Sequence, residues 1–298
     1  MKLIKPSVEW WQQKSLLGHI ARVGRICYKS EGRQPEPNCT SKQALAFLSK
    51  RDKERCESFW NAGHRSMYRH GSAYFFVQND RNLPPAIWAL LQSSPYVSYV
   101  PLDHKVWIST NMQFLCENRP IYDVLNPFSV EEDEFIAKAQ QYHFGDALSI
   151  LRMTFVVTTQ ISTSRELNRT SPNAIAEQST RYCNLERQGG VQIAEPCWYA
   201  SGSRWQRFLY RFVCGISDWA YRRLLISGLK PQDARGVLPL DTYTRVAYTY
   251  NLYEWGHILD LRYHGTTGRP HPNAYDVCRQ VHDIITERMI QYIPEFKI

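Results

Sequence analysis

An apolar run that passes directly into an arginine-rich polar segment constrains this chain more than any other feature. The run from Met153 to Val157 is β-branched and apolar, which is typical of a strand. The segment from Ser164 to Tyr182 follows it and contains Arg165, Arg169, Arg181 and Glu177 among several hydroxyl residues. Guanidinium groups suit phosphate oxygens, and hydroxyl and carboxylate groups can bind a sugar or a base edge. We therefore expect a strand that leads into a nucleotide-binding segment; the alternative is a polar surface loop with solvated arginines.

The composition limits the classes of function. With 298 residues the chain can bury a substantial core as one large domain, and its net charge of +8 makes it basic. The arginines are spread through predicted helices and do not form a run, so the charge favours small anionic ligands over nucleic acid. No window approaches the uninterrupted apolar length of a membrane span, so we expect neither a nucleic-acid partner nor a membrane.

The cysteines indicate a reducing compartment. They stand at positions 27, 39, 56, 116, 183, 197, 214 and 278 and contain no Cys-x-x-Cys pair. The opening residues Met1-Lys-Leu-Ile-Lys lack an apolar leader segment. We therefore interpret the cysteines as reduced thiols of a cytoplasmic protein. Because no tight spacing of metal ligands occurs, we expect no metal site.

Read without gaps from Arg169, the polar segment resembles the signature of flavin-dependent thymidylate synthases. That signature runs Arg-His-Arg, two residues, Ser, one residue, Asn-Glu, one residue, Ser, one residue, Arg-Tyr. The residues that match it are Arg169, Glu177, Ser179, Arg181 and Tyr182. The chain departs from it at Thr170, Ser171, Ala174 and Ala176, where the family has His, Arg, Ser and Asn.

Two stretches near the beginning of the chain resemble further motifs of this family. Arg25-Ile-Cys-Tyr-Lys-Ser30 is similar to the end of its first helix, and we interpret Cys27 as a small core residue and not as a nucleophile. Gly63-His-Arg-Ser-Met-Tyr-Arg-His70 is similar to its Gly-His-Glu-Ser motif with a following histidine.

Two stretches near the other end complete the resemblance. Ala234-Arg235 followed by Leu238-Pro239 matches the family's Ala-Arg, two residues, Leu-Pro; the alternative for this arginine is a plain surface guanidinium. The stretch from Asn251 to Arg262 resembles a helix that begins Asn-x-Arg and ends Leu-Arg, although Tyr253 replaces its flavin-side arginine. For the final arginine, the alternative is a cation that only complements a helix C-terminus.

The resemblance implies an enzyme that methylates C5 of a pyrimidine nucleotide, dUMP to dTMP, with FAD, NADPH and methylene-tetrahydrofolate. It implies a homotetramer with active sites between subunits, and Arg262 as the residue that polarises the base. It assigns the nucleotide to Arg165, Glu166, Arg169, Glu177, Ser179, Arg181, Arg235 and Arg262. It assigns the flavin side to His64, Ser66, Arg169, Thr170, Ser171, Glu177, Asn251 and His257.

The departures from the family pattern fall mainly on the flavin side, at Thr170, Ser171 and Tyr253. Each lost guanidinium removes a charge-assisted contact worth about 1.5 to 3 kcal/mol. Two alternatives therefore stay open. One is a paralogue that binds a pyrimidine nucleotide without flavin redox chemistry, and the other is an enzyme that modifies a different nucleotide, for example by hydroxymethylation.

The resemblance implies an α+β fold, with a central β-sheet flanked by helices, in one domain over residues 1–298. We interpret residues 79–150 as an insertion, which covers either the active site or an oligomer face. Periodicity predicts helices over Val8–Lys29, Ser41–Asn61, Trp205–Ile226 and Asn273–Tyr292, and strands over Ser72–Val77, Met153–Thr159 and Thr242–Tyr250. Ser129 and Glu132 predict a capped helix that runs to about Ile150, whereas residues 80–122 show no sustained period.

Overall fold

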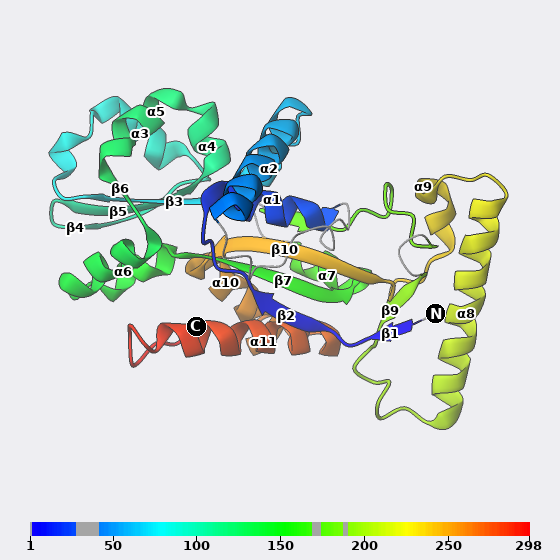
Figure 1. Cartoon of the computed structure of the whole chain (residues 1–298). Helices are drawn as coiled ribbons and strands as arrows, with labels where there is room; N and C mark the ends of the chain where they lie inside the picture. Colours follow the sequence, from blue (N-terminus) through cyan, green and yellow to red (C-terminus); the bar gives the residue numbers. More distant parts are fainter. Residues whose placement is uncertain (1, 28–41, 169–173, 187–189) are drawn as a thin grey trace.

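Two four-stranded sheets and one parallel pair of strands form the β-structure of residues 2–27, 42–168, 174–186 and 190–298, which a computed structural model describes. The first sheet has helices on both faces, and the second lies beside it with its own helical cover (Figure 1). The predicted α+β fold, with a central sheet flanked by helices, is confirmed.

The central sheet is antiparallel and has the order β2 (Ser7–Trp10), β7 (Arg152–Gln160), β10 (Tyr243–Asn251) and β8 (Ile175–Glu177). Helix α1 (Leu16–Cys27) contacts β8 and β10, and α11 (Pro272–Met289) contacts β2 and β7 from the opposite face (Figure 1). Helices α7 (Ile161–Leu167) and α10 (Leu252–Leu259) directly follow β7 and β10. The polar segment therefore begins at the end of a central strand.

Strand β7 has two buried faces, as its apolar sequence requires. Side chains of a strand alternate between the faces of a sheet. Phe155 and Val157 join the large core on the α10 and α11 side, whereas Val156 joins a smaller cluster under α1. Helix α1 is thereby fixed against the sheet that carries the signature.

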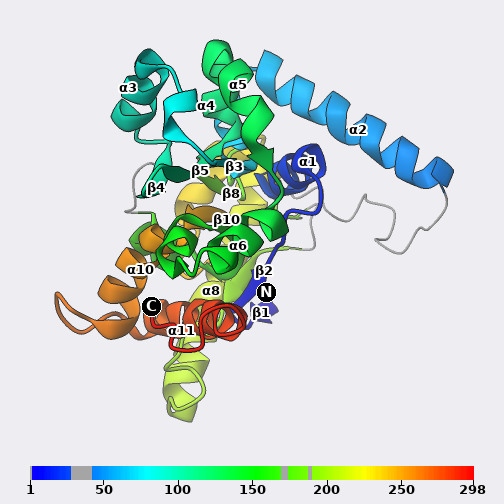
Figure 2. The same ribbon diagram turned by 90° about the vertical axis from the view of Figure 1, so that its left-hand side faces the viewer.

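The second sheet has the order β4 (Ser98–Leu102), β5 (Lys105–Asn111), β3 (Ser72–Val77) and β6 (Ser129–Val130). One face is covered by α3 (Pro85–Ser93), α4 (Met112–Glu117) and α5 (Arg119–Leu125), and α6 (Glu132–Gln141) lies on the other (Figure 2). Phe75 and Val77 pack under the three helices, whereas Tyr74 and Phe76 face the core shared with the central sheet.

The remaining elements lie at the ends of the central sheet. Strand β1 (Lys2–Ile4) pairs in parallel with β9 (Gln192–Ala194), beside the long helix α8 (Arg204–Ile226) and α9 (Pro231–Ala234). Helix α2 (Lys42–Asn61) packs on α1. The 3₁₀ turns are η2 (Arg65–His70), η3 (Asp80–Asn82), η4 (Asn126–Phe128), η5 (Gly145–Ile150) and η7 (Arg235–Val237), and Asp260–His264 (η8) is a π-helical turn.

Two helix predictions need correction. The helix predicted over Val8–Lys29 is wrong in its first part, because Ser7–Trp10 is a strand paired with β7 and α1 begins only at Leu16. Ser129 does not cap a helix but lies in β6, and the helix predicted to about Ile150 ends at Gln141, before the 3₁₀ turn Gly145–Ile150. The assignment of residues 79–150 as an insertion in a single domain stays a prediction.

Candidate nucleotide-binding site

Glu177, the carboxylate of the signature, is held in place by hydroxyl groups from two other elements. It ends β8, and its Oε1 accepts hydrogen bonds from Ser164 Oγ of α7 and Thr244 Oγ1 of β10, each 2.9 Å long. A half-buried carboxylate with two donors has a defined orientation. Strand β8 and the start of the polar segment therefore meet at this group.

The signature turn after β8 docks on the end of α1. The Ser179 N–H donates to the Cys27 carbonyl at 3.0 Å, and the Arg181 N–H donates to Ser179 Oγ at 3.2 Å. The Arg181 guanidinium is exposed, with its central carbon 5.3 Å from the centre of the Tyr182 ring. Burial raises the pKa of the Cys27 thiol to about 11, which agrees with a packing residue and not with a nucleophile.

Arg235 lies beside the same turn although it comes more than fifty residues later in the chain. It begins η7, directly after α9, and its Nη1 donates to Thr180 Oγ1 at 2.7 Å. Its side chain is exposed, so the guanidinium presents donors to solvent next to the turn. The fold thus brings two predicted nucleotide residues, Arg181 and Arg235, to one turn of the chain.

Arg262 meets the other end of the polar segment. It lies in the π-helical turn that follows α10, and its Nη1 is 3.8 Å from Glu166 Oε2 on α7. Only 19% of the Arg262 side chain and 31% of the Glu166 side chain are exposed. Arg165, the neighbour of this glutamate, is exposed. The guanidinium is therefore directed at α7, where the polar segment begins, next to a carboxylate that can hold it.

A family model described as thymidylate synthase complementing protein matches residues 108–295, which is more than half of the chain. The chain belongs to this family. The match contains the signature, Arg235 and Arg262, whereas the stretches around Cys27 and His64 lie before it. It begins within the predicted insertion. The resemblance to flavin-dependent thymidylate synthases is confirmed by this match.

Two solved structures, both of the UMP/dUMP methylase PolB from Streptomyces cacaoi, are similar to this member of the family. The one bound with 5-Br dUMP has 16% identity and a TM-score of 0.43, with 96% of this chain and 93% of that chain covered. The one bound with 5-Br UMP has 23% identity and a TM-score of 0.42, with 57% and 81% covered. At these TM-scores the likeness supports no conclusion about function. No curated protein sequence matches the chain significantly.

The flavin-side residues predicted from the family signature are only partly described. Arg169, Thr170 and Ser171 lie outside the described residues. His64 and Ser66 are exposed at the start of η2.

Two further flavin-side predictions concern α10, one at the residue that caps it and one within it. Asn251 is buried: its Oδ1 accepts from the Glu254 N–H at 2.7 Å, and its Nδ2 donates to Ser98 Oγ at 3.0 Å. Its amide therefore caps α10 and ties the helix to the second sheet. His257 is exposed.

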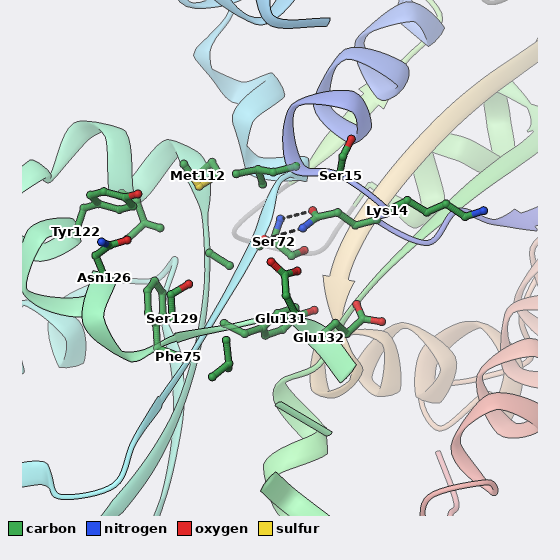
Figure 3. A pocket seen from close by; sticks show the side chains of 16 residues that line it. Lys14, Ser15, Ser72, Phe75, Met112, Tyr122, Asn126, Ser129, Glu131 and Glu132 are labelled. Carbon is green, nitrogen blue, oxygen red and sulfur yellow. Dashed lines mark hydrogen bonds between the residues drawn. The ribbon is translucent and has the colours of Figure 1, made fainter. Parts of the chain in front are cut away.

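Two cavities differ in their relation to these residues. A cavity of about 210 Å³ lies between the second sheet and the segment that joins β2 to α1, where Ser15, Ser72, Tyr122 and Glu131 line it (Figure 3). None of the predicted site residues lines it. A second cavity, of about 370 Å³, is lined by Tyr253 and His257 of α10 and by residues 296–298. This second cavity therefore adjoins two positions of the predicted flavin side: His257, and Tyr253, which replaces the family's flavin-side arginine.

Sequence reasoning missed the partners that orient the family residues. Ser164 and Thr244 hold Glu177, and Thr180 accepts the bond from Arg235. Ser164 and Thr180 stand within the polar segment, so its hydroxyl content was the available signal. Thr244 stands in a strand more than sixty residues away, and only the pairing of β8 with β10 brings it to the carboxylate.

The described part of the chain contains neither a candidate metal centre nor a candidate membrane span. Among those residues no group of three or more His, Cys, Asp or Glu side chains is arranged to hold a metal ion. No helix there has both the length and the hydropathy that a membrane crossing requires.

Proposed function

We propose that this protein converts dUMP to dTMP, with methylene-tetrahydrofolate as the carbon donor and NADPH-reduced FAD as the hydride donor. Membership in the thymidylate synthase complementing protein family supports, in general terms, an enzyme that methylates a pyrimidine nucleotide. The named substrate and cosubstrates are those that the resemblance to flavin-dependent thymidylate synthases implies.

One observation carries the proposal: two arginines that follow the polar segment return to its two ends. Arg262 pairs with Glu166, and Arg235 bonds to Thr180 in the turn next to Arg181. In the proposed reaction Arg262 stabilises negative charge that develops on the pyrimidine ring. Arg181, Arg235 and Ser179 bind phosphate and sugar, for which forked guanidiniums and a hydroxyl are suited.

The face of α10 that lines the 370 Å³ cavity has the chemistry to accept a flat ring. The Tyr253 side chain is 78% exposed, and the His257 imidazole lies one turn further along the helix. An aromatic face and a ring nitrogen suit an isoalloxazine, and the volume fits part of a dinucleotide. When bound, FAD would supply the hydride that completes the methyl group. His64, Ser66 and His257 are the described residues proposed to hold it.

Replacement of Arg262 tests the nucleotide half of the proposal. We expect Arg262→Ala to fold normally, to bind dUMP about a hundredfold more weakly and to form no measurable dTMP, because the lost contact is worth about 3 kcal/mol. Arg262→Lys should recover little, since an ammonium group cannot make a two-pronged contact. Arg269→Ala, at an exposed arginine just beyond the π-helical turn, is the matched control. Wild-type dUMP affinity of Arg262→Ala in calorimetry would refute the assignment.

Flavin uptake separates the enzyme from a nucleotide-binding paralogue. Purified protein should show oxidised-flavin absorbance, or bind added FAD with micromolar affinity when dUMP is present. His257→Ala should weaken FAD binding and leave dUMP binding unchanged, because its side chain lines the cavity beside Tyr253. Binding of dUMP without any uptake of FAD would favour the paralogue and reject the flavin-dependent reaction.

Helix α8 supports the proposed homotetramer. Its inner face buries Cys214 and Tyr221 against the rest of the chain. Its outer face exposes large apolar side chains along most of the 23-residue helix: Trp205, Phe208, Leu209, Phe212, Val213, Ile216, Trp219 and Ile226. Monomeric proteins rarely expose an apolar surface of this extent, and the spacing suits a second helix of the same kind. We propose that two copies pair along α8 within the tetramer.

Light scattering tests the assembly. Trp219→Glu, at a side chain that is 60% exposed, should lower the molar mass from that of a tetramer to that of a smaller species. Gln206→Glu introduces the same charge on the same helix and keeps the capping box with Ser203, so its mass should be unchanged. An unchanged tetramer in Trp219→Glu would show that α8 is not the interface.

A further inference from the structure

The turn that carries Arg262 has an unusual winding. Residues Asp260–His264 are π-helical, and the turn ends at Gly265, whose φ of 71° lies in the left-handed region. Short π-helical turns are rare and occur often at functional sites. An α-helix has 3.6 residues per turn, so loss of the one extra residue in the winding would rotate the following side chains by about 100°. The direction of Arg262 therefore depends on what keeps this turn wide.

The neighbour of Arg262 is held by aromatic contacts to α11. The Tyr263 ring lies 4.6 Å from the His282 ring at an interplanar angle of 30°, and 5.4 Å from the Tyr275 ring at 25°. Tyr275 and His282 are seven residues apart, which places them on the same face of α11. Nearly parallel rings at these distances attract each other beyond their simple burial.

Helix α11 gives this contact a rigid base. Another face of the helix is buried in the core through Val277, Val281 and Ile285, so it cannot shift independently of the central sheet. On the other side of the turn, His264 Nε2 lies 3.1 Å from the carbonyl oxygen of Ile298. The residues that follow Arg262 are thus fixed to two separate parts of the chain.

We propose that Tyr263 is a positioning residue: its packing on Tyr275 and His282 keeps the π-helical turn in the winding that directs Arg262 at Glu166. This inference rests on the proposed role of Arg262 in nucleotide binding. In this proposal the tyrosine acts through Arg262 and not by contact with the nucleotide. It acts by removing the freedom of the turn to rewind, so that the guanidinium is in place before the nucleotide arrives.

A double-mutant cycle tests the proposal with dUMP as the probe. Tyr263→Leu keeps an apolar side chain but removes the ring, and we expect dUMP affinity to fall about tenfold in calorimetry. Tyr263→Phe should restore it, because the ring contacts do not use the hydroxyl. In the Arg262→Ala background Tyr263→Leu should cause no further loss, since a residue that acts through Arg262 has nothing left to position.

A residue with only a structural role would behave differently. Tyr292→Leu, at a half-buried tyrosine beyond α11, should lower thermal stability and leave dUMP affinity unchanged. Wild-type affinity of Tyr263→Leu beside a weakened Arg262→Ala would overturn this inference alone, as would an equal loss in both backgrounds. Wild-type affinity of Arg262→Ala would overturn the proposed function and this inference with it.

Discussion

The two four-stranded sheets differ in what their buried sides contain. The face of the second sheet under α3, α4 and α5 is apolar, with Phe75, Val106 and Ile108 at its centre. On the central sheet, buried polar side chains form a hydrogen-bonded series that runs from α1 over β7 to β10. In this series Thr154 Oγ1 lies 3.0 Å from His19 Nε2 and 2.7 Å from Thr249 Oγ1.

This difference indicates how strictly each sheet depends on the identity of its buried residues. An apolar face tolerates substitutions that conserve volume, whereas a buried series of hydrogen-bonded side chains requires each partner at its position. The hydrogen-bonded series ends at His70, whose Nδ1 lies 2.8 Å from Thr249 Oγ1. The series therefore joins four elements: α1, β7, β10 and η2. The predicted nucleotide residues project from the ends of this sheet. We infer that the central sheet fixes positions, while the second sheet mainly contributes stability.

Arg152 offers the strongest test of this comparison, because its side chain joins the two sheets. Its Nη2 donates to the Arg69 carbonyl at 2.8 Å, and its Nε donates to Ser72 Oγ at 3.3 Å. We expect Arg152→Leu to lower the free energy of unfolding by about 3 kcal/mol, since charge-assisted bonds are lost and their acceptors stay behind. Urea denaturation measures this. Arg279→Leu removes exposed ion pairs and should cost at most about 1 kcal/mol; equal costs would contradict the prediction.

The buried histidines predict a loss of stability in acid. Burial and the nearby Arg22 guanidinium lower the pKa of His19 to about 4. Because the unfolded chain takes up this proton near pH 6.5, the unfolded state binds more protons between pH 6.5 and 4, and stability falls as the pH falls. For His19 the full effect is about 3 kcal/mol, at about 1.4 kcal/mol per pH unit.

His19→Gln isolates this effect. Its free energy of unfolding should depend less steeply on pH between 6.5 and 4.5 than that of the wild type, by about 1.4 kcal/mol per unit. Burial raises the pKa of Glu132 and of Glu254, which acts in the opposite direction as the pH falls. Both glutamates are present in both proteins, so the comparison removes their contribution. Identical slopes would show that His19 is not neutral in the folded protein.

The smallest effect is expected in the second sheet. Ile108→Val deletes one methylene group from a fully buried side chain on β5 and should cost about 0.5 to 1.5 kcal/mol in urea denaturation. Affinity for dUMP should stay at the wild-type value, because this sheet carries none of the proposed nucleotide residues. A weaker affinity in a fully folded sample would mean that the second sheet also positions the site.

Local patterns predicted the regular elements well. The strand Ser72–Val77 has the predicted bounds, and the helix predicted over Trp205–Ile226 begins one residue earlier, at Arg204. Both have a long, consistent period. Val8–Trp10 was predicted as part of a helix, because the partner of this strand lies some 150 residues later and leaves no local signal. In residues 80–122 short helices alternate with strands, so no single period extends over the segment.

The site residues likewise fall into those that local motifs predicted and those that only tertiary structure reveals. Motifs assigned Arg235 and Arg262 to the nucleotide, and the structure brings both arginines to the polar segment. Motifs did not reveal Thr244 or Tyr263, because their partners belong to other elements and only tertiary structure unites them. The sequence of α8 predicted an amphipathic helix. Only the structure shows which of its apolar side chains stay exposed once the inner face has packed on the rest of the chain.

The pairing of the first strands has a consequence for synthesis on the ribosome. Strand β1 pairs with β9, and β2 pairs with β7, so neither has its partner until more than half of the chain has been made. At 5 to 20 residues per second, β1 waits roughly 10 to 40 s for residues 192–194. All strands of the second sheet lie between residues 72 and 130, so that sheet can close much earlier. The unit nearest the proposed nucleotide site is therefore the last to assemble, and the unpaired edge of its β2 strand needs protection from other nascent chains until β7 emerges.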